Sequence, residues 1–442
     1  MITLDERTSL VQRLCNLLKS GIAFHHAGLP LRMRQLVEDL LDERKIRTVV
    51  CTTTLSHGID YPVDNVIILI SGFEKRWELD RYVCVQLKGR AGRPGKTVGR
   101  GRVFLVTEKI KASECMEKYI FGRPEAIYPE TLTKDNLGRL ILIKLNKLIR
   151  YGISSKEIID TILKTLASRK GGINIKSLEI KIIKVLNGLR EFGLLRSSGD
   201  NFQITDMDLF LNEISISPYD AHLVIKSLNK KTLWKINGTK EKAKKMKLKE
   251  ERLEFGLLHL ACCIDVAKRV REELIPLPHP LLKDRCTVTI VDPSSIKPKE
   301  FMMGLNKALI LLDWINEVSL DQITQRYPFF QDYDVFQLGM YASRSLVKIA
   351  KIAEKLGMKS LAEIAQILAI RVRFGVKDDL AKTKLIHIRG IGRKRARLLF
   401  KKGFTIDKLS KSRPRELMNL LGSRELSKIV IKEARRIKSE ER

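Results

Sequence analysis

Apolar runs of strand length alternate with helically spaced segments over the first hundred residues. The stretch VEDLLDERKIRTVVCTTT (37–54) predicts a helix and then a strand from Arg47 to Cys51, which ends in a threonine-rich loop. NVIILI (65–70) and RVFLVT (102–107) are continuous apolar runs, as in strands buried inside a parallel sheet. Strands that alternate with helices in this way predict an α/β domain.

After Pro129 the pattern becomes almost purely helical. Ser154 and Glu157 have the spacing of a capping box at the start of one helix. A later helix is predicted to end at Gly193, where LLRS and NFQIT flank a Ser-Gly-Asp turn and predict a short hairpin. Helices followed by a two-stranded hairpin predict a winged helix, and an accidental helix–hairpin remains the alternative.

Residues 216–375 are helical in pattern, with loops marked by prolines such as Pro276 and Pro293. Within them, the basic stretch 240–252 predicts a solvated helix or loop. A chain of 442 residues with 44% apolar and 30% charged residues is folded rather than disordered, and it is long enough for three or four domains.

The charge changes this picture most. The chain has 83 Lys and Arg against 51 Asp and Glu, a formal net charge of +32. Residues 376–442 hold 21 of the basic residues and 8 of the acidic ones, so the excess is concentrated in the tail. Such an excess favours a polyanionic partner, DNA or RNA. A ribosome-associated protein or a solvated lysine-rich surface stays open on charge alone.

Other functional classes are disfavoured by the sequence. The apolar stretches are too short and too often interrupted by Lys or Arg to predict a membrane span, and the first residues lack a signal-peptide pattern. The seven cysteines are odd in number and form no C-x-x-C pair, which predicts free thiols and a cytoplasmic location. His25 and His26 have no third ligand nearby in the sequence, so no metal site is expected.

The strongest local signal is QLKGRAGRPG (86–95). Arg90 and Arg93 are three residues apart, on one side of a helical turn, and Gly89 and Gly92 remove bulk beside them. Two converging guanidiniums suit the charge that develops on a transferring phosphoryl group. A plain basic loop is the alternative.

Two further segments precede it. CTTTLSHGIDYP (51–62) follows a predicted strand at the edge where open α/β sheets bind ligands, and FHHAGLP (24–30) comes earlier. In this order the three segments resemble motifs IV, V and VI in the second RecA-like lobe of superfamily-2 helicases. The amino-acid sequence of these segments is most similar to the archaeal Hjm family of DNA-repair helicases, which is related to the helicase part of polymerase theta.

The resemblance implies roles for these residues. Gln86, Arg90 and Arg93 would form motif VI, with the arginines acting on an ATP that the other lobe binds. Motif V would couple nucleotide state to the DNA backbone through Thr52, Thr54, Gly58 and Asp60. His26 and Thr52 would lie on the DNA side.

Residues 204–228 and the helical region after them also resemble this family, whose helical domain tracks the translocating strand with one helix. That helix corresponds to about residues 334–356, where Arg344 and Lys348 are four apart and are expected to face phosphates. A solvated face on a core helix is the alternative. The tryptophan that many relatives have on this helix is absent, since Arg344 and Ser345 stand at the matching stretch.

The tail segment LIHIRGIGRKRARLLFKKGF (385–404) predicts two helices joined by a tight turn at Gly390 and Gly392. Glycines there let backbone N–H groups approach a phosphate, assisted by Arg393, Lys394 and Arg397. This is a helix-hairpin-helix pattern, and residues 417–436 resemble a degenerate second copy. A purely structural hairpin is the alternative.

Between the second apolar run and motif VI lies SGFEKRWELDRYVCV (71–85), where the resemblance implies a strand-separating hairpin. Phe73 and Trp77 are its candidate wedge residues. Trp77 could instead anchor the loop to its domain.

Two departures limit the resemblance. The chain contains no G-x-x-x-x-G-K-[ST] and no DExH-type acidic box, so ATP and Mg²⁺ binding is expected only with a complementing first lobe. No apolar strand precedes residue 20, so the α/β lobe starts late.

The predicted architecture is therefore multidomain: an incomplete RecA-like lobe (1–125), a winged helix (126–215), an all-α ratchet domain (216–375) and a helix-hairpin-helix tail (376–442). The resemblance implies the C-terminal part of a 3′–5′ DNA helicase that acts on single-stranded, forked or branched DNA in repair and replication restart. An ATPase-dead DNA-binding module is the alternative. The tail disfavours an exosome-associated RNA helicase.

Overall fold

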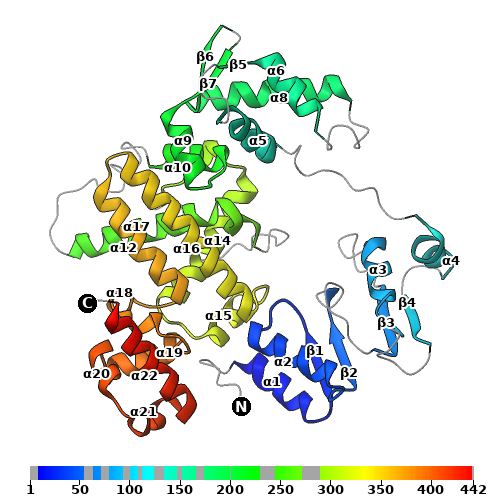
Figure 1. The fold of residues 1–442 in the computed structure, drawn as a ribbon, viewed down its shortest axis with the longest axis vertical. Helices are drawn as coiled ribbons and strands as arrows, with labels where there is room; N and C mark the ends of the chain where they lie inside the picture. Colours follow the sequence, from blue (N-terminus) through cyan, green and yellow to red (C-terminus); the bar gives the residue numbers. More distant parts are fainter. Residues whose placement is uncertain are drawn as a thin grey trace. The chain divides into compact units, whose positions relative to one another are not determined.

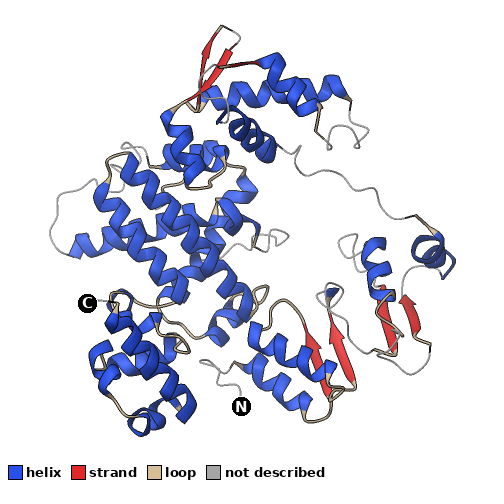
Figure 2. Ribbon diagram, viewed as in Figure 1, coloured by secondary structure: helices blue, strands red, loops and turns tan. Residues whose placement is uncertain are grey.

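The computed structural model describes residues 8–53, 63–70, 79–92, 100–107, 112–123, 134–146, 152–165, 174–199, 201–228, 244–270 and 289–440. They divide into two compact units, residues 1–127 with 331–333, and the remainder from residue 128 (Figure 1). Among the described residues, no helix is both long and apolar enough to cross a bilayer. Strands occur only before residue 205 in this part of the chain, and everything after it is helix or loop (Figure 2).

The first unit begins with helix α1 (Ser9–Leu18), strand β1 (Ile22–His25), helix α2 (Leu31–Asp42) and strand β2 (Thr48–Cys51). The two strands are parallel, with Ile22 opposite Thr48. Buried apolar side chains of α1, α2 and β1 form one core. The strand predicted from Arg47 to Cys51 is confirmed.

A second parallel pair follows, made of β3 (Asn65–Ile70) and β4 (Arg102–Thr107), with Asn65 opposite Arg102. Helix α3 (Arg81–Lys88), helix α4 (Ala112–Met116) and a π-helical turn (Glu117–Phe121) complete this part. Ile68 and Ile70 pack with Cys84, Cys115 and Tyr119 in a separate core. Both predicted strands and the α/β alternation are confirmed. Their expected burial inside a sheet is wrong for one face, where Ile67, Leu69, Phe104 and Val106 are exposed.

The second unit opens with α5 (Lys134–Asn146), β5 (Ile153–Ser154), α6 (Ser155–Leu163), α8 (Ile175–Glu191), β6 (Leu195–Ser198), β7 (Asn201–Ile204) and α9 (Asp206–Glu213). The strands form an antiparallel sheet in the order β5-β7-β6. The predicted capping box is present, since Ser154 and Glu157 exchange hydrogen bonds. The predicted hairpin is also present. Gly193, between α8 and β6, and Gly199, after β6, both have a positive φ.

A helical region follows. Its elements are α10 (Pro218–Ser227), α12 (Lys244–Cys262), a 3-10 helix (Asp265–Arg269), a 3-10 turn (Pro293–Ser295), α14 (Pro298–Ile315), α15 (Leu320–Arg326), α16 (Asp332–Lys355) and α17 (Lys359–Phe374). The predicted basic stretch lies partly in α12. One continuous core runs from Leu137 to Val372, so it joins the hairpin region to these helices.

The tail comprises α18 (Asp378–Ala381), a 3-10 turn (Lys384–His387), α19 (Arg393–Lys401), α20 (Ile406–Lys411), α21 (Pro414–Leu421) and α22 (Arg424–Ser439). Its buried apolar residues, from Val376 to Ile437, form their own core. One expectation is corrected here. The segment before the Gly390 turn is a single 3-10 turn rather than an α-helix, because Ile388 is already extended (φ −70°, ψ 124°).

Candidate nucleic-acid interface and the contacts that position it

The helicase-like motifs of the first unit are only partly described. Gln86 lies in α3 and Arg90 just beyond its end, and both are half-buried. Thr52 follows β2, is exposed, and donates its N–H to the His25 carbonyl at 3.2 Å. The remaining predicted residues of this region lie outside the described part of the chain: Thr54, Gly58, Asp60, Phe73, Trp77 and Arg93.

Gly92 has a structural task within motif VI. It takes a left-handed φ of +67°, and a Cβ there would come within 2.1 Å of the Gly101 backbone nitrogen. Its N–H donates to the Val63 carbonyl at 2.9 Å. The sequence suggested that the lack of a side chain at Gly92 would leave room for a ligand. The structure shows that this room is taken by the neighbouring backbone.

His25 and His26 make contacts with residues close to them in the first unit. His25 is buried, its Nε2 lies 2.9 Å from Glu38 Oε1, and burial lowers the pKa of the ring. His26 stacks on Phe24, and its Nδ1 accepts the Gly28 N–H at 3.1 Å. Within the described ranges, no three His, Cys, Asp or Glu side chains are grouped closely enough to hold a metal ion. The described contacts of both histidines thus organise the loop after β1.

Helix α16 contains the predicted strand-tracking residues, and the structure separates them. Arg344 is exposed, with its guanidinium 5.8 Å from the Tyr341 ring centre. Lys348 instead points into the protein, where its Nζ donates to the Ser215 carbonyl at 2.8 Å and to the Asp265 carboxylate. Arg344 is therefore available to a phosphate, whereas Lys348 holds α16 to the preceding loops.

The tail turn has the backbone shape that the sequence predicted. Gly390 has a φ of +89°, and a Cβ there would lie 2.8 Å from the Leu426 side chain. Gly392 caps the start of α19 with extended backbone. Arg389 and Lys394 are exposed on either side of this turn. The turn therefore presents the start of a helix between two outward cations, which is a suitable arrangement for an anion.

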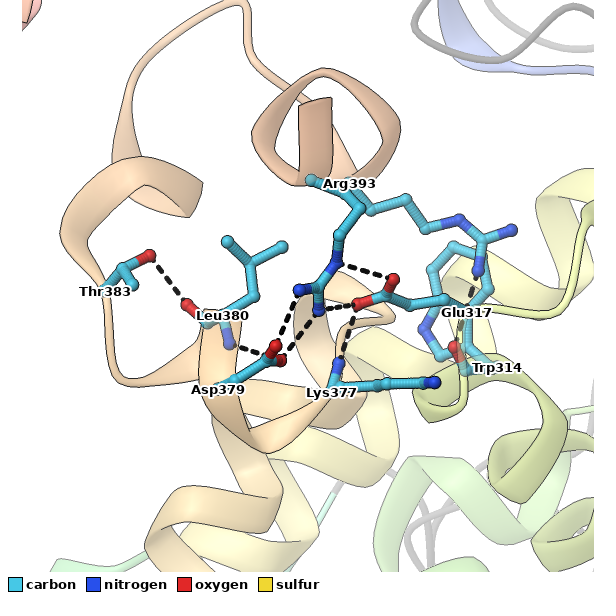
Figure 3. Close-up of polar contacts among 8 residues, drawn as sticks. Trp314, Glu317, Lys377, Asp379, Leu380, Thr383 and Arg393 are labelled. Atoms are coloured by element: carbon cyan, nitrogen blue, oxygen red, sulfur yellow. Dashed lines mark hydrogen bonds and ion pairs between the residues drawn. The ribbon is translucent and has the colours of Figure 1, made fainter. Parts of the chain in front are cut away.

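Arg393, in contrast, faces inward. Only 7% of the residue is exposed, and its guanidinium lies 3.9 Å from the centre of the Trp314 ring (Figure 3). Its two terminal nitrogens donate to the Val318 carbonyl at 2.8 Å and the Trp314 carbonyl at 3.4 Å. The expected phosphate contact by Arg393 is corrected to a contact with the end of α14, because stacking and hydrogen bonds engage the guanidinium there.

Arg397 is also engaged within the protein. Its guanidinium donates to Glu317 at 2.8 Å and to both oxygens of Asp379 at 2.7 and 2.8 Å. This hydrogen bonding keeps the pKa of the Asp379 carboxyl below its ordinary value. Glu317 also accepts the Lys377 N–H at 3.0 Å, so it joins α19 to the start of the tail (Figure 3). The expected phosphate contact by Arg397 is likewise replaced by ion pairs.

Trp314 is the centre of this junction. It is 1% exposed, and its Nε1–H donates to the Val372 carbonyl at 2.8 Å. Gly375 leaves room for its ring, since a Cβ there would come within 2.2 Å of Cε2. Sequence reasoning missed Trp314, Glu317 and Asp379, because nothing local to them signals their partners in the tail. The glycine that follows the helical pattern, Gly375, was the available hint.

Two family models match the chain: a helicase conserved C-terminal domain over residues 1–95, and domain 4 of archaeal helicases over residues 255–375. Similar curated proteins are each called ATP-dependent DNA helicase Hel308. The relative from Caldivirga maquilingensis is 26% identical over 93% of this chain and 55% of its own length. The relative from Pyrococcus horikoshii is 28% identical over the same shares.

A third relative, from Pyrobaculum calidifontis, is 27% identical over 97% of this chain and 58% of its own length. The chain thus spans little more than half the length of the curated relatives that it matches. These matches confirm the relationship that the motifs predicted: the chain is homologous to archaeal superfamily-2 helicases of the Hel308 type and corresponds to their C-terminal part.

Proposed function

We propose that the chain is the C-terminal portion of an ATP-dependent DNA helicase, in which it grips nucleic-acid backbone and completes the motor of an ATP-binding lobe. The observation that carries the proposal is that two cations of the tail are engaged within the protein and two others are exposed. Arg393 and Arg397 fix α19 to the end of α14, while Arg389 and Lys394 remain exposed beside the Gly390 turn. The anchored pair holds the exposed pair in place, which suits a backbone-gripping surface.

The domain assignments belong to this proposal. Residues 126–215 would be a winged helix, supported by helices α5, α6 and α8, the hairpin and a first strand that pairs with it. Residues 216–375 would be the ratchet domain, with Arg344 on its strand-tracking helix. Residues 376–442 would be a helix-hairpin-helix domain, supported by a core separate from the one before it. The helix–turn–helix of α21, Gly422 and α22 would be its second copy.

The catalytic roles are proposed for residues 1–125, as a RecA-like lobe. Gln86, Arg90 and Arg93 would act on ATP and Mg²⁺ bound by a complementing first lobe, and Thr54, Gly58 and Asp60 would couple that site to DNA. Thr52 and His26 would lie near the strand, and Phe73 and Trp77 would separate the duplex. The substrates would be single-stranded and branched DNA, with 3′–5′ translocation.

A second candidate function is an ATPase-dead DNA-binding module. It needs only the DNA-gripping surface, since these 442 residues contain neither a phosphate-binding loop nor a DExH-type box. Both candidates require the same backbone-gripping surface. They differ in whether adding a phosphate-binding lobe restores ATP hydrolysis that depends on Arg90.

The test is a salt titration of DNA binding. Arg389→Gln with Lys394→Gln should weaken binding and lower the slope of log affinity against log salt by about 0.7–0.9 for each phosphate that the variant no longer neutralises. Lys297→Gln with Lys359→Gln removes the same charge from exposed positions on other helices and is the matched control. An unchanged slope for the tail pair, or an equal reduction of the slope in both pairs, would contradict this surface.

A further inference from the structure

Two bends in the second unit place non-glycine residues in the left-handed region of backbone conformation. Ser215 follows α9 with a φ of +54°, and Asp265 opens the 3-10 helix after α12 with the same φ. This conformation is costly for a residue with a side chain, and it persists only where surrounding contacts hold it. The contacts at these two bends therefore mark a position that the fold keeps against a cost.

One side chain contacts both bends. Lys348 of α16 donates to the Ser215 carbonyl at 2.8 Å and to the Asp265 carboxylate. The Lys348 and Asp265 side chains are 17% and 21% exposed, so their ion pair is largely shielded from water. A single cation on α16 thus joins the end of the hairpin region to the start of the 3-10 helix.

The 3-10 helix is also held by two other helices. Asp220 of α10 accepts the Asp265 N–H and the Lys268 ammonium, each at 3.1 Å. Lys307 of α14 is buried and donates to the Ala267 and Lys268 carbonyls at 3.2 and 2.7 Å. Since α10 and α14 fix the 3-10 helix, it offers α16 a rigid support.

A second cation of α16 lies against the same preceding segment. The Lys355 ammonium is 5.5 Å from the centre of the Phe210 ring in α9. Lys348 is four residues after Arg344 and seven before Lys355, a spacing that places all three on one side of the helix. Arg344 is exposed on that side. The contacts that hold α16 therefore lie on the side of the helix that presents Arg344.

We propose that Lys348 is a positioning residue for nucleic-acid binding. It fixes α16 against the two left-handed bends, so that Arg344, one helical turn away, is aimed at a phosphate of single-stranded DNA. Lys348 acts through Arg344 and does not touch the phosphate itself. The role of Arg344 rests on the proposed function, whereas the contacts of Lys348 do not.

This role differs measurably from two simpler ones. A lysine that neutralises a phosphate has its own share in the salt dependence of DNA binding, and that share adds to the share of Arg344. A lysine that only stabilises the fold changes unfolding and leaves the salt dependence unaltered. A positioning lysine has no share of its own, but its removal takes away the share of Arg344.

The test is a salt titration of single-stranded DNA binding by the full chain. Arg344→Gln should reduce the magnitude of the slope of log affinity against log salt by about 0.7, the value for one phosphate on a single strand. We expect Lys348→Met to reduce it by a similar amount and the double variant to reduce it no further. Lys359→Met removes the same charge from an exposed position on α17 and should leave the slope unchanged.

Asp265→Asn is a sharper variant, because every cation of the chain stays in place and asparagine tolerates the left-handed conformation. We expect a reduced slope here as well. If Lys348 contacted phosphate directly, its release from Asp265 would maintain or increase the slope. Asp313→Asn is the matched control, since the Asp313 side chain is also 21% exposed and pairs with Arg326 at 2.8 Å. This control should leave the slope unchanged.

Three results would overturn the proposal. These are an unchanged slope for Arg344→Gln, unchanged slopes for Lys348→Met and Asp265→Asn, and a double variant whose slope falls by the sum of the two single effects. Circular dichroism verifies that each variant is folded, and where Lys348→Met does not fold, the slope of Asp265→Asn decides. The tail pair Arg389→Gln with Lys394→Gln tests the proposed function separately, so the two failures are distinguishable.

Discussion

The tail at residues 376–440 and the first unit at residues 8–123 cover their apolar side chains to different extents. In the tail, the exposed apolar residues Leu398, Met418 and Ile429 are single positions on three separate helices around a closed core. In the first unit, exposed apolar residues form cross-strand pairs such as Ile67 with Phe104. Exposed apolar positions alone therefore mean little, whereas their arrangement separates a closed domain from an open one.

The difference has a simple physical origin. A helix satisfies most of its backbone hydrogen bonds internally, so a few short helices can close a core by side-chain packing alone. A strand depends on its neighbours for every backbone bond at its edges. The described tail thus closes its core by side-chain packing within a short segment, whereas each described strand of the first unit pairs with one neighbour.

The largest expected effect is at the junction that supports the tail. Trp314→Ala removes a buried ring that accepts Arg393 on its face and donates to the Val372 carbonyl. It should lower the free energy of unfolding by about 3–5 kcal/mol. Val50→Ala in the first unit, at a side chain 66% exposed, should cost less than about 0.5 kcal/mol. Urea denaturation measures both, and similar losses of stability would contradict the contrast between the regions.

A smaller effect is expected at Arg397. Arg397→Met leaves the Glu317 and Asp379 carboxylates without their shared partner and should cost about 1–3 kcal/mol. Since the folded-state pKa of Asp379 is lowered, its contribution to stability is present above its unfolded pKa, about 3.9, and is lost as the pH falls through the folded pKa. The variant should therefore lose less additional stability than the parent below about pH 4.

Arg397→Lys is the matched control, because it keeps the charge but not the planar fork. Arg397→Lys should retain part of the parent's loss of stability at acid pH, and its free energy of unfolding should lie between those of the parent and Arg397→Met. Thermal unfolding measured from neutral pH down to about pH 3 separates the three proteins. An Arg397→Met variant with the same acid dependence as the parent would show that this ion pair does not support the tail.

Periodicity carried most of the fold prediction. The strands at 48–51, 65–70 and 102–107 and the hairpin at 195–204 follow from apolar runs and turn residues that are local in sequence. The tail turn at Gly390 was predicted for the same reason, since its left-handed backbone needs glycine. The apolar runs also predicted strands buried inside a sheet, and this was wrong for the exposed face of β3 and β4. Burial depends on packing against other elements, which local patterns do not specify.

The tail cations show where sequence reasoning stops. The local sequence does not distinguish Arg393, Lys394 and Arg397, which lie in one basic segment. All three were expected to contact phosphate. Their directions around α19 differ, and only the structure shows that Trp314, Glu317 and Asp379 lie beside two of them. The contact of Lys348 with Asp265 was also not predictable from local sequence, since the two residues are 83 positions apart.

The smallest effect is expected on the exposed face of β3. Ile67→Thr and Leu69→Thr each place a polar, strand-compatible side chain at a position that is already solvated, and should change the free energy of unfolding by less than about 0.5 kcal/mol. Ile68→Thr, on the closed face of the same strand, should cost about 1–3 kcal/mol because it buries a hydroxyl in an apolar core. Denaturation of the three variants measures the contrast within one strand. Equal losses of stability at Ile67 and Ile68 would mean that both faces are covered in solution, which would remove the distinction drawn between the first unit and the tail.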